Sequence, residues 1–255
     1  MSVHACRARA VLVALMLAGA VAAGADEGLV GWWRFDETGG LAVVDGSGNG
    51  RDGQILADAQ GVEHVAGRSG GALAFTGGPQ DARGEAGCVA IAGLGEIDWS
   101  RGLTIEVWVR FDELVRPSTY EIVSNTVADR GPGFRLMLSW ASLWLRSGEG
   151  GSGRTWGAGS DPSVTALRTG EWYHLAGTYD GSVFRVYVDG ALVGESEPGL
   201  TLTPGEPTVW VGSYRAGFAY GLTGAVDDLR LYSTARSAAQ IVMDAKLGTA
   251  AGAAM

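Results

Sequence analysis

Hydrophobic and polar residues alternate along much of the chain, and this period of two predicts β-strands. The clearest case is residues 103–111 (LTIEVWVRF), where apolar residues occupy every odd position and Thr104, Glu106 and Arg110 lie between them. Such a strand is half-buried in an antiparallel sheet. Further runs dense in β-forming residues occur at 29–35, 72–77, 88–94, 120–127, 134–140, 142–147, 171–181, 183–196, 207–214 and 224–233.

Turn and capping motifs mark the ends of the predicted elements. Asp189-Gly190 separates two apolar runs and predicts a two-residue type I′ hairpin. Near the C-terminus, Ser237 and Gln240 form a capping box ahead of an apolar run, which predicts one short helix. The residues 248–255 (GTAAGAAM) are expected to form a disordered tail.

These elements together predict an all-β fold. Many short strands without interleaved helices favour an antiparallel sandwich over an α/β fold. The 42 glycines are spread through the chain without a collagen period, as expected for strands joined by tight turns. Residues 147–161 are rich in glycine and are interpreted as a long surface loop of a single domain that spans residues 26–247.

The first 25 residues have the pattern of a secretory signal peptide. Arg7 and Arg9 precede an apolar run at 11–23, and Ala23-Gly24-Ala25 is a small-x-small cleavage site. The apolar run is too short to span a bilayer. We therefore expect cleavage after Ala25, a secreted or periplasmic protein, and no membrane insertion of the mature chain.

The net charge of the chain narrows the classes of macromolecule that it can bind. The chain has 19 Lys and Arg against 28 Asp and Glu, a net charge of −9. Such a surface repels phosphate backbones, so nucleic acid is excluded as a partner.

The mature chain keeps one cysteine. Cys6 leaves with the signal peptide, and Cys88 alone cannot form an internal disulfide. Its apolar neighbours predict a buried core thiol.

Six segments in order resemble a known family: GWWRFDE, DGSGNGRDG, GGALAFTG, LTIEVWVRF, EWYHLAGTYDGSVFRVYVDGALV and GAVDDLRLY. Together they resemble the LamG-like jelly-roll domain of the concanavalin A-like lectin/glucanase superfamily, from about Leu29 to about Lys246. The resemblance implies a two-sheet antiparallel jelly-roll sandwich. It also implies binding of extracellular or cell-envelope glycan or protein, often with a structural calcium ion.

The acidic segment GEIDWS (95–100) is the candidate for catalysis. The resemblance to laminarinase-like glycosidases suggests an E-x-D-x-E strand, in which Glu96 and Asp98 would be followed by a third acid, but Ser100 stands at that position. The alternative interpretation is a turn before the strand at 103–111.

No other catalytic motif occurs in the sequence. His64 and His174 lack the spacing of zinc ligands, and His174 is expected to be a hydrogen-bonded packing residue. We therefore predict a protein without catalytic residues.

The nine tryptophans are candidates for sugar stacking, since indole rings pack well on flat apolar faces. Trp156 lies in the glycine-rich segment 147–161 and is predicted to be an exposed platform, with Arg154 and Asp161 as hydrogen-bonding partners. Two others, Trp108 and Trp144, are expected on the outer side of a sheet. The expected core tryptophans are Trp32 or Trp33, Trp172 and Trp210.

The segment DGSGNGRDG (45–53) contains the oxygen-bearing side chains of a turn or a calcium loop. It is not an EF-hand, because the twelfth position is Leu56. The resemblance implies a calcium ion near the chain ends. The predicted ligands are Asp36, Asp45, Asn49, Asp227 and Asp228.

Alternation places Asp227 on the core face with Leu229 and Leu231, although a β-bulge would exchange the roles of Asp227 and Asp228. The alternative is that Asp45 and Asn49 only cap a turn.

Three functions fit these observations. The favoured one is a secreted, non-catalytic recognition module for glycan or extracellular protein, with a structural calcium ion. A glycoside hydrolase of the same fold and a purely structural protein-contact module are the alternatives. An exposed aromatic side chain with nearby polar groups would favour the first, and two facing carboxylates in a cleft would favour the second.

Overall fold

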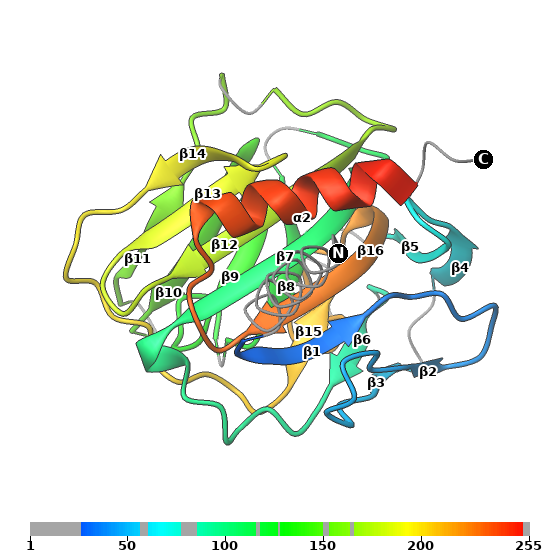
Figure 1. Ribbon diagram of the computed structural model, residues 1–255, viewed down its shortest axis with the longest axis horizontal. Helices are drawn as coiled ribbons and strands as arrows, with labels where there is room; N and C mark the ends of the chain where they lie inside the picture. Colours follow the sequence, from blue (N-terminus) through cyan, green and yellow to red (C-terminus); the bar gives the residue numbers. More distant parts are fainter. Residues whose placement is uncertain are drawn as a thin grey trace, which may run out of the picture.

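Two antiparallel eight-stranded sheets, A and B, pack face to face in the computed structural model (Figure 1). The structure describes residues 27–56, 61–77, 86–115, 118–126, 128–149, 153–163 and 166–251, so the predicted signal peptide lies outside the described residues. The predicted antiparallel jelly-roll sandwich with one C-terminal helix is confirmed. Among the described residues, no helix combines the length and apolar character needed to cross a membrane.

Strands from both ends of the chain meet in sheet A. In spatial order it contains β14 (Ala191–Glu195), β13 (Phe184–Val188), β12 (Trp172–Tyr179), β7 (Leu103–Phe111), β16 (Thr223–Tyr232), β5 (Gly71–Thr76) and β4 (Val62–Ala66), and β1 (Leu29–Trp33) also pairs with β16. The pairing of β1 with β16 brings the N-terminal and C-terminal strands together.

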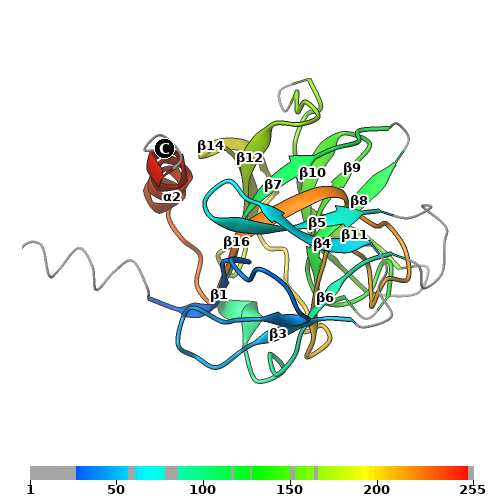
Figure 2. The same ribbon diagram turned by 90° about the vertical axis from the view of Figure 1, so that its right-hand side faces the viewer.

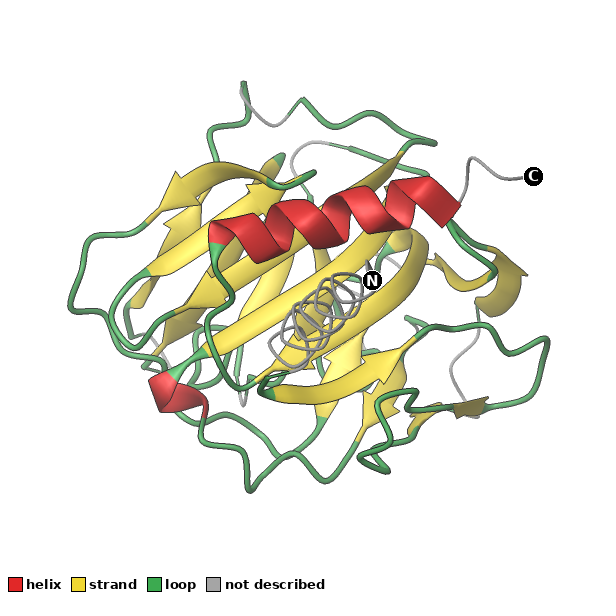
Figure 3. Ribbon diagram, viewed as in Figure 1, coloured by secondary structure: helices red, strands yellow, loops and turns green. Residues whose placement is uncertain are grey.

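Sheet B is built from the remaining strands. In spatial order it contains β11 (Thr155–Gly159), β10 (Ser142–Gly148), β9 (Arg135–Ser139), β8 (Thr119–Ser124), β15 (Val209–Val211), β6 (Val89–Ile91), β3 (Gly53–Ile55) and β2 (Ala42–Val43). Figure 3 shows that loops connect most of these strands directly.

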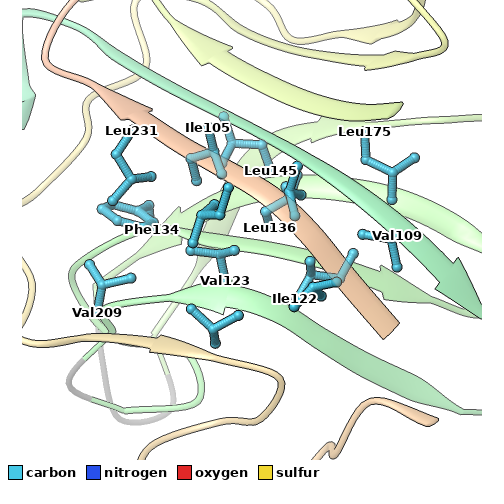
Figure 4. Packing of buried hydrophobic residues seen from close by; sticks show 14 of the residues in the cluster. Ile105, Val109, Ile122, Val123, Phe134, Leu136, Leu145, Leu175, Val209 and Leu231 are labelled. Carbon is cyan, nitrogen blue, oxygen red and sulfur yellow. The ribbon is translucent and has the colours of Figure 1, made fainter. Parts of the chain in front are cut away.

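The core lies between the sheets and follows the alternation of the sequence. Ile105 and Val109 of β7 face Leu136 of β9 and Leu145 of β10, and all four are fully buried (Figure 4). Burying one such side chain contributes about 1.5–3 kcal/mol. Cys88 is also fully buried, as predicted.

The helix α2 (Ala238–Ala251) covers the outer face of sheet A (Figures 1 and 2). Its buried Ile241 packs on Ala176 of β12 and Tyr187 of β13. The predicted capping box is present, since the Ser237 N–H donates to Gln240 Oε1 at 2.8 Å. The helix continues to residue 251, so the prediction of a disordered tail beginning at residue 248 is wrong for its first four residues.

Two hairpins use two-residue turns with left-handed backbone. Asp189 and Gly190 have φ angles of 49° and 81° between β13 and β14, which confirms the predicted type I′ turn. Trp140 and Ala141 have φ angles of 54° and 66° between β9 and β10, a turn that lacks the usual Asn and Gly signal.

The segment 147–161 is a hairpin rather than one long loop. Residues 155–159 form β11, which pairs with β10 in the register Arg146 to Gly157 and Trp144 to Gly159. The sequence prediction was wrong here because glycines within a strand weaken the alternation signal.

Candidate functional site

The outer face of sheet B carries a transverse row of polar and aromatic residues. Cross-strand register aligns Arg146 of β10 with Arg135 of β9, Arg135 with Ser124 of β8, and Ser124 with Trp210 of β15. Each of these strands directs its apolar residues inward, as the buried neighbours Val209 and Val211 of Trp210 illustrate. The row therefore lies on the side of the sheet away from the core.

A buried ion network occupies the middle of this row. Arg135 Nη2 lies 2.5 Å from Glu121 Oε2, and its Nη1 lies 2.7 Å from Asp129 Oδ1. Burial alone would lower the pKa of Arg135, but Glu121 and Asp129 hold it above its usual value. Arg135 is thus a permanent cation whose charge is satisfied locally.

The loop 212–221 covers this network. The guanidinium carbon of Arg135 lies 5.0 Å from the ring centroid of Tyr214 and 5.4 Å from that of Tyr220. Burial raises the pKa of both tyrosines, so both keep their phenolic protons near neutral pH. The two rings shield the charges from water and fix the loop on the sheet.

Beside this cover, the tip of the same loop forms a pocket with β15. The pocket has a volume of about 300 Å³ and is lined by Glu206, Trp210, Arg215, Ala216 and Phe218. Glu206 accepts from Trp210 Nε1 at 3.4 Å and lies 3.3 Å from Arg215 Nε. Phe218 is 45% exposed.

This arrangement has the chemistry of a polar, ring-shaped ligand site. The two aromatic rings offer flat apolar surfaces, while the paired acid and guanidinium offer an acceptor and several donors. Among the lining residues Glu206 is the only acid, so the pocket does not hold the pair of carboxylates that a retaining or inverting glycosidase uses.

A second hollow lies at one end of the sandwich, and most of its lining residues are apolar. It has a volume of about 150 Å³ and is lined by Leu114, Val115, Tyr120, Leu138, Ala141, Pro162, Ala166 and Leu167. The Tyr120 hydroxyl accepts from the Val115 N–H at 3.0 Å, so one acceptor position of the only side-chain hydroxyl among the lining residues is already used. None of its lining residues carries a charge, so it does not offer the paired acid and guanidinium of the Trp210 pocket.

The predicted ligand set on the 147–161 segment is not gathered into such a site. Trp156 is half-buried, packs against the core, and donates from Nε1 to the Thr201 carbonyl at 2.6 Å. It is not an exposed platform, because β11 directs it to the same side as buried Ala158. Arg154 is exposed and lies 3.4 Å from Glu149, while Asp161 accepts from Ser163. Those bonds from Ser163 lower the pKa of Asp161.

The segment 45–53 is a turn attached to the edge of β1. Asp45 accepts the backbone N–H groups of Trp32, Ser47 and Arg51, at 3.1, 2.9 and 3.0 Å. Burial would raise the pKa of Asp45, but these hydrogen bonds hold it below its usual value. Asn49 donates to the carbonyls of residues 29 and 30, at 3.0 and 3.2 Å. The turn therefore satisfies the edge of β1 that β16 does not pair.

Two of the other predicted calcium ligands, Asp36 and Asp227, contact the turn 67–71. Asp227 accepts from the Ser69 N–H at 3.0 Å, and Asp36 accepts from the Gly71 N–H at 2.8 Å. Burial raises the pKa of Asp227 to about 7, with further contributions from the negative charges of Asp228 and Asp36. No cluster of three or more acidic, His or Cys residues suited to a metal occurs in the described part of the chain.

A bulge in β16 decides where Asp227 points. The register against β7 shifts between Asp227 and Arg230, and Asp228 has a φ angle of 53°. Asp227 is consequently opposite Trp108 on the outer face of sheet A, and the prediction that it shares the core face with Leu229 is wrong. Asp228 instead accepts from Trp32 Nε1 and pairs with Arg230 at 2.9 Å.

The acidic segment at 95–100 forms the predicted turn. Asp98 caps the short 3₁₀ helix η1 (Trp99–Arg101), and its Oδ1 accepts from the Ser100 N–H at 3.0 Å and from its hydroxyl at 2.6 Å. The hydrogen bonds from Ser100 lower the pKa of Asp98. Asp98 is thus engaged as a turn former, and the alternative interpretation of this segment is the correct one.

Sequence reasoning missed the Trp210 pocket, although a signal was present. The alternation in Val209-Trp210-Val211 places the indole opposite the two valines and predicts an outward position. Trp172 and Trp210 are half-buried on outer faces, so their assignment to the core was wrong, whereas Trp33 is a core residue. Trp108 and Trp144 lie on outer faces as predicted.

Comparison with known proteins supports the fold. The family described as the concanavalin A-like lectin/glucanases superfamily matches residues 83–242, more than half of the chain. No curated protein matches the sequence.

Solved structures of binding domains are similar in fold. Domain 4 of AbnA, an extracellular arabinanase from Geobacillus stearothermophilus solved with arabinotriose, has a TM-score of 0.60 and 19% identity, over 85% of this chain and 98% of that one. The binding domain of botulinum neurotoxin DC, in complex with rat synaptotagmin II, has a TM-score of 0.64 and 14% identity over 87% of this chain. This chain spans about half (52%) of that toxin domain, and at these identities the likeness concerns the fold alone.

Proposed function

Since the chain belongs to the concanavalin A-like lectin/glucanases superfamily, we propose that it is a non-catalytic module that binds a glycan on the outer face of sheet B. The observation that carries this proposal is the pocket in which Trp210 and Phe218 stand beside the Glu206–Arg215 pair. The related folds include a domain solved with arabinotriose and one solved with a protein partner, so binding by this sandwich has precedents of both kinds.

A glycan fits this pocket better than a protein surface does. Sugars present flat C–H faces that stack on indole, and hydroxyl groups that need both donors and acceptors close by. Glu206 and Arg215 provide both next to the ring of Trp210. A protein interface is instead expected to centre on a larger apolar patch.

The test is a glycan array on the purified mature protein, followed by titration of the strongest ligand with Trp210→Ala. Loss of the stacking surface is expected to weaken binding at least about tenfold, or about 1.4 kcal/mol. Trp156→Ala is the matched control, because its indole is bonded to Thr201 away from this face. Unchanged affinity in Trp210→Ala, or no ligand on the array, would refute the proposal.

We also propose that a structural calcium ion binds near the turn 67–71. Asp36 and Asp227 would supply carboxylate oxygens, and their mutual repulsion is what a divalent cation would relieve. Asp45 and Asn49 do not join this set, because the carboxylate of Asp45 accepts three N–H groups and the amide of Asn49 donates to β1. A bound ion would add rigidity without entering the ligand site, which lies on the other sheet.

The proposed site of action is outside the cytoplasm, after removal of residues 1–25. The Ala23-Gly24-Ala25 site and the apolar run before it support export. N-terminal sequencing of protein recovered from the culture medium or periplasm is expected to begin at Asp26, and a retained Met1 would refute export.

A further inference from the structure

Arg146 differs from the other arginine of the row on sheet B. It lies on β10 with its Cα opposite that of Arg135, and both point to the outer face. Arg135 is held by two carboxylates, whereas Arg146 forms no ion pair with any described residue. Its Nε is buried and has no hydrogen-bond partner in the described part of the chain. Leaving a buried charged donor unsatisfied costs more than leaving a neutral one.

The charges around Arg146 do not supply the missing partner. Glu121 and Asp129 are near enough to influence it, but both carboxylates are bound by Arg135 at 2.5 and 2.7 Å. Tyr220, the other polar neighbour, carries no charge near neutral pH because burial raises its pKa. Burial lowers the pKa of Arg146, and the positive charge of Arg135 lowers it further. The guanidinium would therefore gain from an added anion.

The strand next to Arg146 leaves room for a ring platform. Trp144 lies two residues earlier on the same face of β10, roughly 7 Å along the strand. The neighbouring strand β11 presents glycine opposite both residues, Gly157 to Arg146 and Gly159 to Trp144. A Cβ atom at Gly159 would lie 2.6 Å from the indole of Trp144, so the ring extends over the glycine. No side chain of β11 stands at these two positions.

We propose that Trp144 and Arg146 select a glycan whose sugar ring carries a carboxylate, such as a uronate or a sialate. The indole would stack on the ring, and the planar guanidinium would bind the carboxylate with two parallel hydrogen bonds. This inference rests on the proposed function and adds the class of ligand to it. Trp210 lies three strand spacings away, about 14 Å, and the loop 212–221 that covers Arg135 stands between the two positions, so an oligosaccharide that contacts both must pass over this loop.

The experiment compares ligands that differ only in the carboxylate. One pair is an oligogalacturonate and its carboxyl-reduced form, and the other is sialyllactose and lactose; binding of each is measured by calorimetry. The wild-type protein is expected to prefer one acidic member over its neutral partner by about tenfold or more, as charge-assisted bonds are the stronger ones. The pair that shows the preference identifies the source of the carboxylate. The preference should shrink as salt is added.

Variants then assign the preference to a residue. Arg146→Gln is expected to abolish the preference while retaining binding of the neutral sugar, and Arg146→Lys to keep part of it. Arg168→Gln is the matched control, because it removes the same charge from an exposed arginine whose ion-pair partner is Glu171 at 3.6 Å. The melting temperature of Arg146→Gln should not fall, since no ion pair is lost.

Two results would overturn the inference. Equal affinity of the wild type for the acidic and neutral members of both pairs is one, and a full preference in Arg146→Gln is the other. The proposed function is tested separately, because it requires that Trp210→Ala weaken binding of the acidic and the neutral member alike. If Trp210→Ala weakens binding but Arg146→Gln keeps the full preference, the glycan site at Trp210 is supported. Only the proposed selectivity for acidic sugars is then refuted.

Discussion

The outer faces of the two sheets both bury charged side chains, and they differ in what covers them. On sheet A, Glu106 lies 2.8 Å from Arg236 and 3.2 Å from His174, and α2 closes over this group. The Glu106–Arg236 contact is at ion-pair distance without a well-aligned hydrogen bond. Burial raises the pKa of Glu106 despite these partners. His174 is thus the buried packing residue that the sequence predicted.

On sheet B, the corresponding cover is a loop rather than a helix. Tyr214 and Tyr220 of this loop shield Arg135, and the loop leaves a pocket beside Trp210. The loop provides no hydrogen-bond partner for Arg146 Nε in the described part of the chain. Buried charge must be compensated wherever it occurs. Under α2 the buried Glu106 has the cation Arg236 at ion-pair distance, and the face is closed. On sheet B, Arg146 has no such counter-ion among the described residues, and a ligand can supply one.

The largest effect is expected from breaking the ion network of sheet B. Arg135→Met should lower the free energy of unfolding by about 3–5 kcal/mol, because it leaves Glu121 fully buried without its cation. The double variant Arg135→Met/Glu121→Leu should recover most of this loss. Denaturant unfolding measures both. A double variant no more stable than the single one would show that Arg135 acts through its packing under the tyrosines and not through its charge.

The second-largest effect on stability is expected from the ionisation of Asp227 on sheet A. Its folded pKa of about 7 exceeds the unfolded value of 3.8, so the folded state favours the protonated form. Without calcium, stability should therefore fall as pH rises from about 4 to about 7, by at most about 4 kcal/mol, and stay low above that range.

Asp227→Asn tests this dependence and the proposed metal together. It should remove the loss of stability between pH 4 and 7 in EDTA and raise the melting temperature at pH 8. It should also abolish any stabilisation of the wild type by added calcium. Asp98→Asn is the control, since Asp98 is exposed and lies in a turn. Identical melting curves of the wild type in calcium and in EDTA would contradict the calcium proposal and leave the pH effect intact.

The smallest effect is expected from loosening the helix on sheet A. Ser237→Ala removes one half of the capping box and should cost about 1 kcal/mol. Hydrogen exchange should then accelerate in α2 while sheet B remains protected, since the buried Ile241 of the helix packs on β12 and β13 of sheet A. Faster exchange across both sheets would mean that the two faces are not independent.

Much of the fold follows from local patterns in the sequence. Alternation located most strands, Asp189-Gly190 specified a hairpin, and Ser237 with Gln240 specified the start of α2. The sequence analysis did not identify β11 as a strand, because Gly157 and Gly159 occupy its outward positions and the alternation of polar and apolar side chains is absent there. The site was only partly predictable: Trp144 was expected on an outer face, whereas Trp210 was assigned to the core.

The sequence by itself determined which residues can face outward, because side-chain direction along a strand depends on the nearest neighbours in the chain. Only the tertiary structure decided which outward residues meet. The bulge at Asp228 changed the phase of β16 and moved Asp227 from the core to the outer face. The cross-strand register placed Arg135 between Arg146 and Trp210, although 64 residues separate the latter two in sequence. Compensation of a buried charge depends on such distant partners, and no local pattern encodes them.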